Sequence, residues 1–133
     1  MMQKAKFDKI TMNRTASYGT SPVYSLEILG NGQVTFEGIG FVKSKGNHHW
    51  ELPNTAITQI NNELFSSRFF EIQKQSDYCI IESCQSYSTL TVWMDTGETR
   101  TIEHDLGSSE WPQSLTDFES LIINVSGIKK YLT

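Results

Sequence analysis

Apolar and polar residues alternate along several short stretches of the chain, which predicts β-strands with one buried face. The stretches are Ile10–Thr15, Val23–Leu29, Gln33–Gly38, 48–52, Ser88–Met94 and Thr99–Asp105. The Asn31–Gly32 pair and the sequence DTGE at 95–98 separate consecutive stretches, and such sequences favour the tight turns of hairpins. Gly38 and Gly40 predict a bulge or bend. The first stretch is expected to be a short half-buried or edge strand.

The period of the apolar residues changes to three or four in two other stretches, which predicts amphipathic helices. Their apolar stripes are Ile57, Ile60 and Leu64 in the first, and Leu115, Phe118, Ile122 and Val125 in the second. The helices are expected over 53–67 and 112–125. Ser114 with Asp117 fits a capping box at the start of the second helix, and Gly127 supplies a stop after it.

Two helices with one apolar stripe each, and a sheet with one apolar face, predict a two-layer α+β domain. We expect an antiparallel sheet of about five to six strands from two hairpins, covered on one face by the two helices. The 133 residues have the length of one ordinary domain, and 38% hydrophobic content is typical of a chain with one core. Residues 1–9 are expected to form a flexible or weakly ordered N-terminus.

The charge balance restricts the classes of partner. Eleven Lys and Arg residues stand against fifteen Asp and Glu residues, and the basic ones are scattered along the chain. Binding to nucleic acid or to an anionic membrane surface needs clustered basic residues. We therefore expect no nucleic-acid partner and no membrane partner.

Targeting signals and cysteines indicate the compartment. The sequence has no apolar run of signal-peptide or transmembrane length, so a cytoplasmic location is expected. In that compartment Cys79 and Cys84 should stay reduced. Their spacing fits neither a thioredoxin-type motif nor a paired zinc knuckle.

The segment ITMNRTASYGTSPVYSLEILGNGQVTFEG and the elements after it, to about Ile123, resemble a bacterial domain family of unknown function. The hallmark of that family has the form R-T-x-C-F-G-x-C-P-V-Y. Ser17 and Ser21 stand here at the two cysteine positions, and Tyr18 stands at the phenylalanine. The resemblance implies an architecture and no activity. Thiolate, disulfide or soft-metal chemistry of the cysteine pair cannot run on hydroxyl groups, so we interpret this segment as a structural corner.

Trp93 is the best candidate for a binding residue. It falls on the strand face opposite Leu90 and Val92, together with Thr89 and Thr91. An exposed Trp on an uncovered sheet face is typical of an interaction surface. Our first hypothesis is therefore a non-enzymatic binding module, whose partner is another protein or a second copy of the chain. The sequence predicts no catalytic residues and no cofactor for it.

Two alternatives remain open. One is a small metal-dependent or acid–base enzyme that uses His104 with His48 or His49, since adjacent residues on a strand point to opposite faces and only one of the pair could join a site. The other is a small-molecule binding fold with a pocket lined by aromatic residues. Its candidate lining residues are Tyr24, Phe36 and Trp50.

Overall fold

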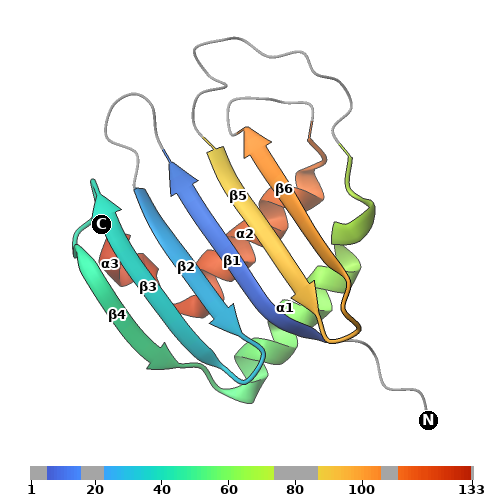
Figure 1. The fold of residues 1–133 in the computed structure, drawn as a ribbon, viewed down its shortest axis with the longest axis horizontal. Helices are drawn as coiled ribbons and strands as arrows, with labels where there is room; N and C mark the ends of the chain where they lie inside the picture. Colours follow the sequence, from blue (N-terminus) through green and yellow to red (C-terminus); the bar gives the residue numbers. More distant parts are fainter. Residues whose placement is uncertain (1–5, 16–22, 74–86, 106–110, 133) are drawn as a thin grey trace.

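The computed structural model describes residues 6–15, 23–73, 87–105 and 111–132. Within these residues, six strands form one antiparallel sheet in the order β4-β3-β2-β1-β5-β6 (Figure 1). The strands are β1 (Phe7–Thr15), β2 (Val23–Leu29), β3 (Gln33–Gly40), β4 (Gly46–Glu51), β5 (Tyr87–Met94) and β6 (Thr99–Asp105). The two predicted hairpins are thus β2–β3 and β5–β6.

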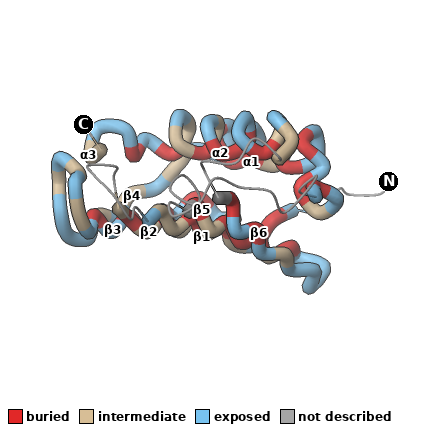
Figure 2. Tube along the Cα trace, turned by 90° about the horizontal axis from the view of Figure 1, so that it is seen from above, coloured by how far each residue is buried: buried red, intermediate tan, exposed pale blue. Residues whose placement is uncertain are grey.

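The helices form a second layer on one face of the sheet (Figure 2). They are α1 (Asn54–Ser66), the 3-10 helix η1 (Phe69–Glu71), α2 (Gln113–Ser126) and α3 (Lys129–Leu132). The two-layer α+β fold predicted from the sequence is confirmed. None of the helices in the described ranges has the length and apolar character needed to cross a membrane.

The core lies between the sheet and α1 and α2. Strand alternation sends every second side chain towards the helices, and the predicted helical stripes face them. Ile60, Leu115, Phe118 and Ile122 are fully buried in this layer. The opposite side of the sheet, which we call the open face, is covered by no helix or strand of the described residues (Figure 2).

β1 differs from its prediction because it is a long central strand. It starts at Phe7, which is 2% exposed, and pairs with β2 on one side and β5 on the other. Residues 7–9, expected to be weakly ordered, therefore belong to the sheet. The prediction of a half-buried or edge strand came from polar residues at alternate positions, which indicate a face in contact with water. In an antiparallel sheet a central strand can also have one such face.

Glycines shape the first hairpin as predicted. Gly32 has φ 101°, which the Asn-Gly turn requires, and the β2–β3 register shifts opposite Gly38 and Gly40 as expected for a bulge. Gly127 ends α2 with φ 86°. The predicted capping box of α2 is wrong.

The start of α2 lacks a side-chain cap because its N-cap residue is Pro112. Asp117, the expected capping partner of Ser114, instead accepts a hydrogen bond from Gln113 Nε2 at 3.1 Å. Proline can precede a helix without losing a hydrogen bond, because the first backbone N–H groups have no partner within the helix.

Candidate functional site

Trp93 lies on the open face, as strand alternation predicts, and it is half-buried there. Cross-strand pairing places it between Lys9 of β1 and Thr99 of β6. The Lys9 ammonium lies 4.4 Å from the centroid of the Trp93 ring. This cation–π contact covers part of the indole and leaves the rest accessible.

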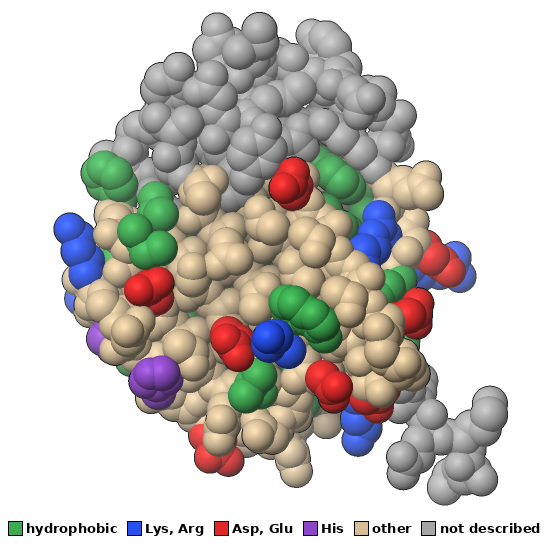
Figure 3. Space-filling model, viewed as in Figure 1, with side chains coloured by type: hydrophobic (Ala, Val, Ile, Leu, Met, Phe, Trp, Pro, Cys, Tyr) green, Lys and Arg blue, Asp and Glu red, His purple; other side chains and the backbone are tan. Residues whose placement is uncertain are grey.

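Neighbouring strands extend this surface across the sheet. Figure 3 shows the open face, where backbone and side chains that are neither apolar nor charged make up most of the area of the described residues. Thr91 pairs with Thr11 on β1 and with Thr101 on β6, and the Thr91 and Thr101 hydroxyl oxygens are 2.9 Å apart. Thr89 pairs with Asn13 and Glu103 in the next row.

A polar hollow of about 240 Å³ lies beside these rows on β1 to β4. Glu27 and Glu37 are the charged residues of its lining. The other side chains that line it supply hydroxyl or amide groups, apart from Leu26: Thr11, Asn13, Ser25, Thr35 and Asn47. The hollow and Trp93 thus share one acidic, hydrogen-bonding surface.

Tyr24 and Trp50 lie on the inner face of the sheet, in an aromatic cluster closed by α3. Tyr24 and Phe36 have ring centroids 5.5 Å apart, and Tyr131 stacks on Phe36 at 5.4 Å. Trp50 contacts the same Tyr131 ring at 5.4 Å and donates from Nε1 to the Ser126 carbonyl at 2.8 Å. A ligand pocket between these rings is therefore a wrong prediction, because Tyr131 occupies that space.

The predicted pairing of His104 with His48 or His49 is also wrong. Both histidines of the pair belong to β4, and His104 belongs to β6, so they lie on the two opposite edges of the sheet. Five strand spacings of about 4.8 Å separate them by roughly 24 Å. His48 stacks on Tyr131 at 4.2 Å, and His49 Nδ1 lies 3.2 Å from the Thr35 hydroxyl on the open face.

His104 instead belongs to a row of polar residues that crosses the inner face. The register pairs Tyr24 with Arg14, Arg14 with Ser88, and Ser88 with His104, so one polar residue comes from each of four adjacent strands. We call these four residues the buried polar row. Three of them are at most 4% exposed, and Arg14 is half-buried.

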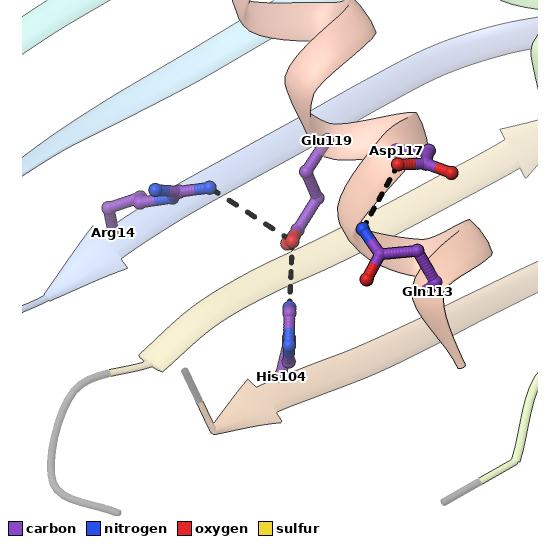
Figure 4. A network of polar contacts seen from close by, with 5 residues as sticks. All are labelled: Arg14, His104, Gln113, Asp117 and Glu119. Carbon is purple, nitrogen blue, oxygen red and sulfur yellow. Dashed lines mark hydrogen bonds and ion pairs between the residues drawn. The ribbon is translucent and has the colours of Figure 1, made fainter. Parts of the chain in front are cut away.

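Glu119 of α2 lies over this row and contacts two of its members, Arg14 and His104 (Figure 4). His104 Nδ1 donates to Glu119 Oε1 at 2.7 Å, and an Arg14 guanidinium nitrogen lies 4.0 Å from the same oxygen. The Glu119 side chain is 2% exposed. The Trp111 ring meets His104 edge-on at 5.9 Å. One buried carboxylate therefore ties α2 to both β1 and β6.

Several atoms of this network have no hydrogen-bond partner among the described residues. They are Arg14 Nε, Tyr24 Oη, Ser88 Oγ and Glu119 Oε2. Burial raises the pKa of the Tyr24 hydroxyl, and the Arg14 charge opposes this while the Glu119 charge adds to it. The Tyr24 hydroxyl is therefore neutral throughout the physiological range.

A carboxylate that orients an imidazole is an arrangement found in acid–base catalysis, but it also occurs in structural networks. Here His104 and Glu119 are both almost fully buried, and no metal-binding group of three His, Cys, Asp or Glu residues occurs in the described parts of the chain. Because Glu119 is buried and contacts residues of both β1 and β6, we interpret the network as the polar anchor of α2. Cys79 and Cys84 lie outside the described residues, as do Ser17 and Ser21.

Glu119 is the residue that the sequence interpretation missed. It sits four residues after Leu115 and three before Ile122, within the apolar stripe of α2, and is 1% exposed. A charged residue at such a position signals a buried partner, because an unpaired buried charge is too costly to retain. Its partners could not be identified from the sequence, since they come from distant strands.

The chain matches a known protein family. The model of a family described as "Domain of unknown function (DUF6438)" matches residues 8–126, which include β2 to β6, β1 except its first residue, and both long helices. A search of curated proteins gives no match. The family therefore covers most of the fold and leaves the function to be argued from the residues of this chain.

Proposed function

The chain belongs to the DUF6438 family, and we propose that it is a non-enzymatic binding module that presents the open face of its sheet to a protein with a basic surface. The observation that carries the proposal is the position of Trp93 on the open face beside an acidic hollow. A large aromatic side chain that keeps part of its area in contact with water is a typical anchor of a protein interface.

The charges of the open face support a basic partner. Glu27 and Glu37 line the hollow, and Glu103 lies farther along the same face on β6. Lys9 is the basic residue that pairs with Trp93 on this face. An exposed face with this excess of carboxylates attracts Lys and Arg side chains and repels nucleic-acid phosphates.

The same charges disfavour a second copy of the chain as the partner. Two open faces packed against each other would place the acidic hollow of one copy near carboxylates of the other. Juxtaposed like charges oppose association. Self-association through this face is therefore an outcome that would contradict the proposal.

Chemical-shift mapping tests the proposal with a defined probe. A decapeptide of alternating lysine and serine is titrated into ¹⁵N-labelled protein at low salt, and an equivalent glutamate–serine peptide serves as the anionic control. We expect shifts of the Trp93 indole N–H and of the amides that line the hollow with the basic peptide only. Equal response to both peptides, or shifts centred on α1 and α2, would contradict the proposal.

Charge-reversal variants distinguish the effect of the open face on peptide binding from the effect of the net charge of the protein. The double variant Glu27→Lys/Glu37→Lys should lower the peptide affinity at least about tenfold, because two attractive contacts become repulsive. Asp117→Lys/Glu63→Lys changes the net charge equally on the helix layer and should keep more of the affinity. Trp93→Asp should lower the affinity while the fold is retained. Sedimentation equilibrium of the unmodified protein should give a monomer.

A further inference from the structure

A second surface feature lies on another part of the molecule, where α1 ends beside the β5–β6 hairpin. It is a groove of about 220 Å³ with a mainly apolar lining, which we call the η1 groove. The buried side chains of Leu64, Phe69 and Met94 form its base, and the more exposed Phe65 and Phe70 add to its lining. The groove has room for a single ring or a branched alkyl group.

The groove is held in shape by the chain that follows α1. Arg68 adopts a left-handed backbone conformation with φ 53°, which turns the chain from α1 into η1. Arg100 of β6 then donates to the backbone carbonyls of Phe69 and Ile72. Phe69 and Phe70 meet edge to face at 5.6 Å. A guanidinium that holds two carbonyl groups fixes η1 to the sheet, so the groove exists before any ligand arrives.

The electrostatics of the groove favour a cation. The C-terminal end of α1 carries the negative pole of the helix dipole, and its last turn has no basic residue. Glu98 is exposed in the hairpin turn and lines the groove. Arg68 and Glu71 also line it, and they pair with each other at 3.8 Å, so their charges largely offset. Among the charged side chains that line the groove, Glu98 is therefore the one whose charge is not offset within the lining, while the Arg100 guanidinium is bound to the Phe69 and Ile72 carbonyl groups.

We propose that the η1 groove binds a small organic cation, in which an ammonium group is carried on one aromatic or branched apolar body. The apolar body packs against Leu64, Phe69 and Met94, and removal of this surface from water drives binding. The ammonium group lies towards Glu98 and the end of α1. The faces of nearby aromatic rings also favour a cation.

Titration with two ligands of opposite charge tests this proposal. Phenethylammonium and 3-phenylpropionate have one phenyl ring and a two-carbon spacer each, and they differ in the sign of their charge. We expect phenethylammonium to bind with a dissociation constant on the order of millimolar, as its size allows. It should bind at least about threefold more tightly than the anion, given the usual strength of helix-dipole and exposed carboxylate contacts. Chemical-shift changes should centre on residues 64–71 and on the β5–β6 turn.

Two variants test whether Glu98 is the carboxylate that causes the preference for the cation. Glu98→Gln should weaken phenethylammonium binding about twofold to fivefold and leave 3-phenylpropionate unchanged or slightly tighter. Glu103→Gln removes a carboxylate from the open face and should change neither affinity. The proposal is overturned if neither ligand binds, if the anion binds as tightly as the cation, or if Glu98→Gln and Glu103→Gln have the same effect. The open face takes no part in this test, so its result is independent of the proposed function.

Discussion

Replacement of Glu119 by alanine removes the carboxylate that joins α2 to two strands. The carboxylate accepts a 2.7 Å hydrogen bond from His104 Nδ1, and the side chains of the two residues are 2% and 5% exposed. Removing the acceptor of a buried hydrogen bond costs about 1–3 kcal/mol, and more where a charged group is involved, because the remaining donor stays buried without its partner. The Arg14 contact, at 4.0 Å and with 24% of that side chain exposed, adds little. We therefore expect the free energy of unfolding to fall by about 3 kcal/mol.

Guanidinium unfolding followed by tryptophan fluorescence measures this loss, and thermal unfolding should show a decrease in Tm of roughly 10 °C. Glu119→Gln keeps an acceptor of similar shape and should cost less. In a double-mutant cycle, His104→Leu and Glu119→Leu should be less damaging together than the sum of the single changes, by about 1.5–3 kcal/mol. A loss below about 1 kcal/mol for Glu119→Ala, or strict additivity in the cycle, would refute the anchoring role of the pair.

Three further predictions concern the fold. Because the pKa of Tyr24 is raised in the folded protein, the stability that its neutral hydroxyl contributes is complete below pH 10.0, the ordinary pKa of tyrosine. This stability is lost as the pH rises from there through the pKa of the folded state. Tyr24→Phe should therefore flatten the alkaline decrease in stability measured by urea unfolding. Arg100→Ala should cost about 1–3 kcal/mol, because two carbonyl groups beside η1 lose a charged donor, and hydrogen exchange of η1 should accelerate while that of β2 and β3 stays unchanged. Gly38→Ala would place a Cβ 2.3 Å from the Ser44 carbonyl oxygen and should lower the unfolding free energy by about 2 kcal/mol. Gly40→Ala, where the nearest atom to the new Cβ is 3.9 Å away, should be close to neutral. Equal losses of unfolding free energy for the two variants would contradict the close approach at Gly38.

Most of the secondary structure could be predicted from local pattern. The bounds of β2 and β6 agree with the prediction to the residue, and both long helices start and end within two residues of their predicted limits. Alternation with a period of two and stripes with a period of 3.6 depend only on residues close together along the chain, so they can be recognised in the sequence. The capping box failed for a local reason, since proline and the Gln113–Asp117 hydrogen bond at 3.1 Å took the place of the expected cap.

The candidate sites were predicted less completely. The outward position of Trp93 follows from alternation, and the binding role of Thr89, Thr91 and Trp93 stays a prediction that the peptide titration tests. The histidine hypothesis failed because strand order decides which side chains meet, and β4 and β6 are the two edges of the sheet. His104 did prove to be part of a polar cluster, but with Glu119 as its partner.

The sequence by itself determined most of the elements, the single core and the buried faces of the predicted strands and helices, because these follow from the spacing of apolar residues along a short length of chain. The tertiary structure alone decided that β1 is central, that Arg14, Ser88 and His104 form one row, and that Glu119 lies over them. These relations join residues up to about a hundred positions apart, such as Arg14 and Glu119. They depend on the packing of the whole chain, and no local pattern of polar and apolar residues encodes them.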